Sequence, residues 1–168
     1  MENVENSFAP FDLTKTPKFD RETDKEHLTK SFYRLASQYY AAARFILFNQ
    51  EWIPVAMTNV AFSCELFLKA ILYGYDIDFK SIHGLEALFK MLPQKEQDYI
   101  ANNIAIENRE REFHICLHEQ DKAFVEYRYM CEAKSMTGNP KFLFAFADIL
   151  KSVYESLLKE NGKEDELI

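Results

Sequence analysis

Arginine and histidine side chains gather between Asn108 and His118, and together they are the residues that metal-independent RNA cleavage uses. Arg109 and His114 have the spacing Arg-x4-His, and Arg111 and His118 the spacing Arg-x6-His. In that chemistry histidine moves protons and arginine stabilises the charge that develops on the phosphate. On one straight helix Arg109 and His114 diverge by about 140°, while Arg111 and His118 share a face that points away from the apolar stripe. The segment predicts either a ribonuclease site or a solvated charged face.

The same segment does not indicate a metal site. His114 and His118 are four residues apart, but residue 115 is isoleucine where the zinc-protease pattern needs glutamate. Cys116 points about 200° away from His114 and so belongs to another face. The sequence also contains no Gly-rich phosphate loop and no serine-centred nucleophile motif. We therefore expect no metal and no cofactor.

Two charged residues interrupt a segment that is otherwise apolar on most sides. Glu65 and Lys69 lie between Ala56 and Leu72, where a charge has to be paired or used. Their i, i+4 spacing lets them pair with each other, either as a self-satisfied ion pair or as the polar lining of a ligand pocket. His83 precedes a short helix, where it would cap the helix or line a pocket at its N-terminus.

Arg128 lies beside an apolar stripe with a seven-residue period. The stripe consists of Ile106, Phe113, Leu117, Phe124 and Cys131. Arg128 is only about 40° from its centre on a helical wheel, so it is predicted to lie next to the core and to need a carboxylate. Glu132 is one turn away, and Glu65 is the partner expected across the bundle. Arg128 is then either half of a structural ion pair or an anion-binding arginine in a cleft.

Helices with recognisable ends are predicted to position these side chains. A first helix begins after Thr23, which forms a capping box with Glu26, and ends near Asn49. Its apolar face has the spacing of Leu28, Phe32, Leu35, Tyr39, Ala42 and Ile46. Pro54 starts a second helix over about 55–73, which is apolar on most sides and therefore belongs in the middle of a bundle.

The pattern stays helical to the end of the domain. A short helix is predicted over about 84–91, and Pro93 begins a long helical region that is one helix or two with a bend. Asn139 as N-cap and Pro140 at N1 start the last helix. We expect an all-α fold, an antiparallel bundle of four long helices plus a short one. Residues 21–160 form the domain, 1–20 an extended or partly disordered arm, and 161–168 a polar tail.

Composition restricts the function further. The chain has 168 residues and a formal net charge of −7, which disfavours the broad basic surface that duplex DNA requires. Three cysteines without regular spacing argue against a disulfide scaffold. The acidic N-terminus does not resemble a signal peptide, and no apolar run approaches the roughly 20 residues of a membrane span. We expect a cytoplasmic protein.

Three motifs together resemble the HEPN superfamily (higher eukaryotes and prokaryotes nucleotide-binding). They are Ala61-Phe62-x-x-Glu65-Leu66-x-Leu68-Lys69-Ala70-x-Leu72, then His83-x-Leu85-x-x-Leu88-Phe89, then Phe124-x-x-x-Arg128-Tyr129-x-x-Glu132. The likeness covers roughly residues 25–160. It implies an antiparallel helical bundle that usually dimerises. Some members are metal-independent ribonucleases of toxin–antitoxin and defence systems, with Arg-x4-6-His motifs that Arg109 and His114 match. Others bind nucleotides, or partner a nucleotidyltransferase, without being nucleases.

The likeness is closer to the non-nuclease branch, whose marks are His83 and Arg128-Tyr129. We therefore expect a homodimeric, non-enzymatic binding or regulatory module for a nucleotide or RNA, with Glu65, Lys69, His83, Arg128 and Tyr129 at its ligand. One alternative is a ribonuclease toxin that uses Arg109 and His114. Another is a structural partner of a nucleotidyltransferase or of another protein encoded nearby.

Overall fold

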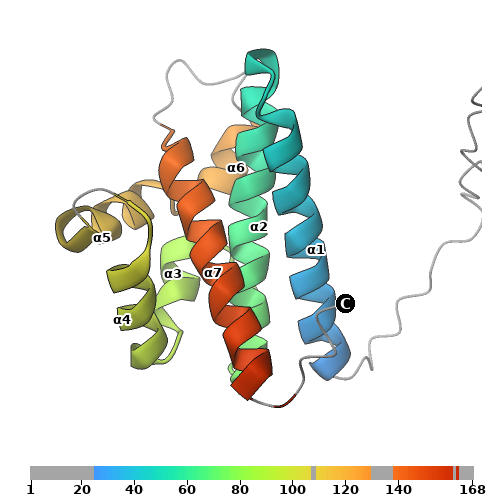
Figure 1. The fold of residues 1–168 in the computed structure, drawn as a ribbon, viewed down its shortest axis with the longest axis vertical. Coiled ribbons are helices and arrows are strands. Elements are labelled where there is room, and N and C mark those ends of the chain that lie inside the picture. The colour runs from blue at the N-terminus through green and yellow to red at the C-terminus, as the bar shows by residue number, and fades with distance from the viewer. Residues whose placement is uncertain (1–24, 107–108, 130–137, 161, 163–168) are drawn as a thin grey trace, which may run out of the picture.

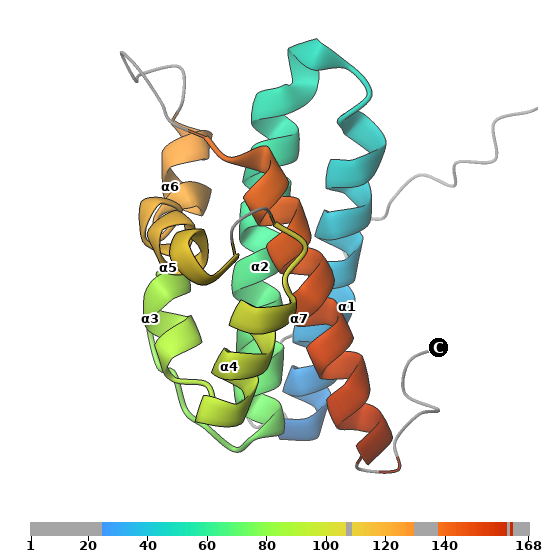
Figure 2. The same cartoon turned by 60° about the vertical axis from the view of Figure 1, so that its left-hand side comes forward.

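The computed structural model describes residues 25–106, 109–129, 138–160 and 162, and every regular element within them is a helix. The long helices α1 (Lys25–Ile46), α2 (Ile53–Gly74) and α7 (Pro140–Glu160) stand side by side, and a short 3-10 helix, Gln50–Trp52, joins α1 to α2 (Figure 1). Four shorter helices cover the remaining side of α2 and α7 (Figure 2); they are α3 (Leu85–Lys90), α4 (Gln94–Asn103), α5 (Arg109–Glu119) and α6 (Ala123–Arg128). The all-α helical bundle predicted from the sequence is confirmed.

Helix α2 forms the centre of the bundle, as its apolar composition predicts. It packs against α1, α3, α6 and α7, and every residue from Val60 to Leu72 except Phe62 is buried. Pro54 lies in its first turn, where its missing N–H removes no intrahelical hydrogen bond. Because neighbours surround α2 on most sides, its polar side chains have to find partners within the protein.

By length and composition, α2 could also cross a membrane, which the sequence prediction of no such apolar run overlooked. In the described part of the chain it is the one helix that meets this test. However, 78% of the apolar window is buried inside the bundle. The apolar surface of α2 is thus used by the protein's own core, which accounts for its composition.

Helix α1 presents a different face to the core from the predicted one. Ala36, Tyr40 and Ala43 are buried, whereas Leu35 is 41% exposed and Ala42 is exposed. Phe32 and Tyr39 of the predicted stripe are half-buried and pack against the core, so the buried face overlaps the stripe along one edge and is rotated from it by less than one residue, or less than about 100°. The small alanines allow α1 to lie close against α2, and this close approach outweighs the burial of the larger Leu35.

The last helix agrees with the prediction. Asn139 is the N-cap of α7, because its Oδ1 accepts a hydrogen bond from the backbone N–H of Phe142 at 3.0 Å. Phe142, Phe146, Val153 and Leu157 are buried on one face. Aromatic and aliphatic side chains from α7 thus fill the space between α2 and the short helices.

The long helical region predicted after Pro93 is three helices, α4, α5 and α6. A turn at Gln120–Lys122 separates α5 from α6, so a single helical wheel does not apply across both. Several predicted features lie outside the described residues. They are the Thr23 capping box, the arm at 1–20, Cys131, Glu132 and the tail apart from Gly162.

Candidate functional site

The structure brings together Glu65, Lys69 and His83, which the sequence nominated separately. Lys69 Nζ donates to Glu65 Oε1 at 2.7 Å, and His83 Nδ1 lies 2.8 Å from the same oxygen. The side chains of Glu65 and Lys69 are only 2% and 8% exposed, whereas that of His83 is 67% exposed. The predicted Glu65–Lys69 pair therefore exists, and it is buried beneath a histidine that faces solvent.

The geometry defines the chemistry of this cluster. His83 Nδ1 lies 3.4 Å from Lys69 Nζ as well, but the shorter contact with the carboxylate, which only accepts hydrogen bonds, assigns the proton to Nδ1. Lys69 Nζ also lies 5.3 Å from the centre of the Phe79 ring, close enough for a cation–π contact. Within the described residues, Glu65 Oε2 is buried and has no hydrogen-bond partner. The cluster thus holds His83 in a fixed orientation and retains one unused buried acceptor.

His83 does not cap α3, which corrects one of its two sequence interpretations. That role belongs to Asp121, whose Oδ1 accepts from the N–H of Glu86 at 2.8 Å and whose backbone O accepts from the N–H of Leu85 at 3.1 Å. Gly84 makes this approach possible, because a Cβ at that position would lie 2.7 Å from Asp121 Oδ1. His83 is thereby free to turn towards Glu65.

Arg128 does not pair with Glu65, contrary to the sequence prediction. Its side chain is exposed, and its guanidinium lies 4.4 Å from the centre of the Phe124 ring and 5.6 Å from that of Tyr129. Because a turn separates α5 from α6, the angle measured on one continuous helix does not describe Arg128. The arginine is accommodated by aromatic rings at the surface rather than by a buried carboxylate.

Arg128 and Tyr129 line a groove of about 580 Å³ against the first turns of α2. The other lining residues are Pro54, Val55, Thr58, Asn59 and Tyr127. Tyr129 is 53% exposed. Thr58 Oγ1 donates to Pro54 O at 2.9 Å. The groove therefore combines a cation, an exposed aromatic ring and the side-chain amide of Asn59.

The groove and the buried cluster lie along the same face of α2. Thr58 and Glu65 are seven residues apart, which returns to within about 20° on a helix. Between them Phe62 stacks on Phe124, with ring centres 4.4 Å apart. Lys69 follows Thr58 by eleven positions, which correspond to about 16 Å along the helix axis. We give the name α2 strip to this line, which runs along α2 from the groove at Thr58, past Phe62 and Glu65, to Lys69 and His83.

The predicted ribonuclease residues lie on α5, away from this strip. His114 is exposed, and its ring lies edge-on to Phe113, with centres 5.1 Å apart. Arg109 is the first residue of α5, but its side chain is not among those described. His118 Nδ1 lies 2.7 Å from Glu86 Oε2, and no group of three possible metal ligands occurs in the described residues.

The Glu86 carboxylate gives a testable pH dependence. Hydrogen bonds from Lys90 and then His118 hold the pKa of Glu86 below its usual range. A carboxylate with a lowered folded-state pKa stabilises the fold above its unfolded-state pKa, and loses that effect as the pH falls through its folded-state pKa. We expect Glu86→Gln to lower the free energy of unfolding by less than about 1 kcal/mol at pH 7, because the site is partly exposed.

Urea denaturation across the acid range measures this effect. The difference between wild type and Glu86→Gln should shrink as the pH falls below about 4. Glu126→Gln, at an exposed carboxylate, serves as the control. If the difference in the free energy of unfolding between wild type and Glu86→Gln stayed constant down to the lowest pH measured, it would contradict the lowered pKa of Glu86.

Sequence reasoning missed Phe124, Asn59 and Asp121 as parts of the site. Phe124 was assigned to an apolar stripe and to the third motif but not to the site, although it stacks on Phe62 and supports Arg128. Asn59 belongs to none of the motifs considered in the sequence, so nothing there nominated it. Aspartate is a common helix cap, but Asp121 caps a helix far from it in sequence: Glu86, whose N–H it accepts, lies 35 residues earlier.

Comparison with known proteins identifies one family. A family model described as HEPN domain matches residues 29–138, which include α2, α3 and α6 with the whole α2 strip. No curated protein and no solved structure matches the chain.

Proposed function

Because this chain belongs to the HEPN domain family, we propose that it is a non-enzymatic binding or regulatory module for a nucleotide or a short single-stranded RNA segment. Family membership itself supports a nucleotide- or RNA-related module. The finer assignment rests on the α2 strip, where two exposed groups of suitable chemistry, Arg128–Tyr129 and His83, lie on one face of the domain.

The groove beneath Arg128 is the observation that carries the proposal. The guanidinium is held against Phe124 and beside Tyr129, and it can contact a phosphate while an exposed aromatic ring stacks on a base. An amide such as that of Asn59 provides donors and an acceptor for a base edge. The groove can therefore contact the phosphate, the face of the base and the edge of the base.

Of the buried cluster, only His83 is placed to touch a ligand. Glu65 and Lys69 are almost completely covered, so they act as positioning residues that orient the imidazole. The strip is about 16 Å long, while a stacked strand advances about 3.4 Å along its axis for each nucleotide. A single nucleotide would therefore fill the Arg128 groove, and a strand of about five nucleotides would reach His83.

Fluorescence anisotropy with a labelled single-stranded RNA of about ten nucleotides tests the proposal. We expect Arg128→Ala to weaken binding about tenfold or more and to reduce the slope of log K against log salt by about 0.7. Tyr129→Ala should also weaken binding about fivefold or more, through lost stacking. Both side chains are exposed, so the variants should fold normally.

The control for Arg128 is Arg34→Ala, at an exposed arginine on α1. His83→Ala should weaken binding of the RNA but not of a mononucleotide such as ATP. Equal binding by wild type, Arg128→Ala and Tyr129→Ala, with folding confirmed by circular dichroism, would overturn the proposal.

The second candidate function is a metal-independent ribonuclease, because the His114 imidazole is exposed on the helix that begins with Arg109. RNA cleavage in the presence of EDTA decides between the two. Cleavage that is lost in His114→Ala and kept in Arg128→Ala would replace the binding-module proposal. Without cleavage by the wild type, the binding module stands.

A further inference from the structure

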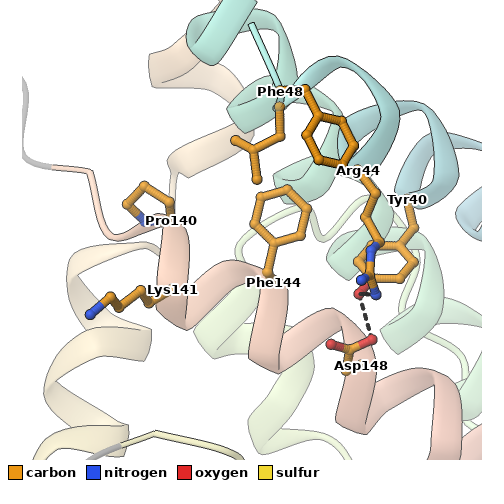
Figure 3. Close-up of a pocket in the computed structure, with 8 residues that line it drawn as sticks. Tyr40, Arg44, Phe48, Pro140, Lys141, Phe144 and Asp148 are labelled. Carbon is orange, nitrogen blue, oxygen red and sulfur yellow. Dashed lines mark hydrogen bonds between the residues drawn. The ribbon is translucent and has the colours of Figure 1, made fainter. Parts of the chain in front are cut away.

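A second groove lies on the opposite side of the α1–α2 turn, between the end of α1 and the start of α7 (Figure 3). It has a volume of about 470 Å³. Its lining residues are Tyr40, Arg44, Leu47, Phe48, Pro140, Lys141, Phe144 and Asp148. None of them belongs to the α2 strip, so this groove is a separate surface.

The groove is apolar in the middle and positively charged at its rims. The Phe144 ring stands between the Pro140 side and the Tyr40–Arg44 side, and the Lys141 side chain extends from the far rim in the direction away from Phe144 (Figure 3). Arg44 Nη1 donates to Tyr40 Oη at 3.2 Å, which keeps the guanidinium over the near rim. The carboxylate of Asp148 accepts the hydrogen bond of Tyr40, so it is already in use.

Exposed aromatic side chains continue this surface beyond the groove. Phe48 is 93% exposed although it lines the groove, and Phe45, on the preceding turn, is 81% exposed. Large apolar side chains next to an apolar groove mark an interaction surface more often than an ordinary solvent face. Because Phe48 stands outside the groove floor, it fits an occupant larger than a small molecule.

Charge decides which occupant fits. Within the described part of the chain, the groove is lined by two cations, Arg44 and Lys141, and by one carboxylate, Asp148, so its net charge is positive on a chain whose formal net charge is −7. A second copy docked face to face would bring together two grooves with the same excess of positive charge, which is unfavourable in a self-complementary interface. Unlike the groove at Arg128, this one has no side-chain amide among the described residues that line it to contact a base edge, so a nucleic acid is the less suitable occupant.

We propose that this groove docks an acidic amphipathic helix of a partner protein. The apolar residues of such a helix, repeated at i and i+4, would cover Phe144 and Phe48, as in other helix-in-groove complexes. Its flanking carboxylates would meet Arg44 and Lys141. The surface would thereby let the domain engage a partner and a ligand on different faces at once.

A peptide library displayed on phage tests this directly, with helical sequences randomised at apolar and charged positions. Selection on the full-length wild-type protein should enrich acidic amphipathic sequences. For the strongest peptide, Phe48→Ser should weaken binding about 30-fold or more, as for a hot-spot residue. Tyr99→Ser, at an exposed aromatic residue of α4 that does not line the groove, is the control and should leave binding unchanged.

Charge reversal provides a gain-of-function test. Arg44→Glu with Lys141→Glu should reject the selected peptide and bind its lysine-substituted counterpart. Arg34→Glu with Lys122→Glu has the same change in net charge on exposed residues outside the groove and should keep the original preference.

Three results would overturn the proposal. One is enrichment of basic or uncharged sequences, or of none. Another is a wild-type dimer in sedimentation equilibrium that Phe48→Ser dissociates, which would make a second copy the occupant. The third is displacement of the peptide by single-stranded RNA in wild type and Arg128→Ala alike. RNA binding lost only in Arg128→Ala concerns the α2 strip and leaves this groove unaffected.

Discussion

Glu65→Ala is expected to lower the free energy of unfolding by about 3–5 kcal/mol. The substitution removes the carboxylate that lies 2.7 Å from the ammonium of Lys69, a residue that is only 6% exposed. An unpaired charge in such a site is far more costly than the loss of a surface ion pair. Urea denaturation at neutral pH, followed by circular dichroism, measures the change.

Two controls distinguish a buried charge from a merely lost contact. Glu65→Leu combined with Lys69→Met removes both charges and should recover most of the stability, since apolar replacement of a buried pair is often neutral. Lys90→Ala removes half of an exposed pair of the same i, i+4 spacing and should cost less than about 1 kcal/mol. A Glu65→Ala effect as small as that of Lys90→Ala would contradict the burial of the pair.

Phe113→Ala is expected to cost about 3–5 kcal/mol and to lower the melting temperature by about 10 °C. Phe113 is 1% exposed and fixes α5 to the bundle. Its ring centre lies 5.1 Å from that of Phe89 on α3 and 6.0 Å from those of Phe142 and Phe146 on α7. Truncation leaves a cavity where three other rings meet, and the helices around it cannot collapse fully.

Differential scanning calorimetry measures this effect. Phe48→Ala, at a ring that is 93% exposed, is the control and should stay within about 0.5 kcal/mol of wild type. Phe113→Leu should recover part of the loss because it restores much of the volume. If Phe113→Ala melted with the wild type, α5 would not be anchored by this aromatic cluster.

Features that depend on local sequence were predicted well. Pro54 and the Asn139–Pro140 pair mark helix starts because their chemistry suits first-turn positions wherever the helix lies. The central place of α2 follows from its apolar composition, and the Glu65–Lys69 pair from its spacing. In each case the residues that decide the outcome are within a few positions of one another.

Features that depend on how separate elements meet were not predicted. Arg128 was placed beside the core because helical periodicity was carried through the turn at Gln120–Lys122, and the rotation of α6 is independent of α5. The bond between His83 and Glu65 joins residues 18 apart across a loop, so no periodicity encodes it. The face of α1 was misjudged because size alone does not show where alanine permits close packing.

Asp121 connects the two ends of the α2 strip through the backbone. It lies in the turn that leads into α6, and it bonds to the first N–H groups of α3, two residues after His83. The contacts of Asp121 therefore determine both the orientation of α6 and the path of the chain at His83. A substitution at Asp121 should therefore disturb both ends of the strip at once, whereas Arg128→Ala and His83→Ala remove side chains that take no part in the Asp121 contacts and should have additive effects.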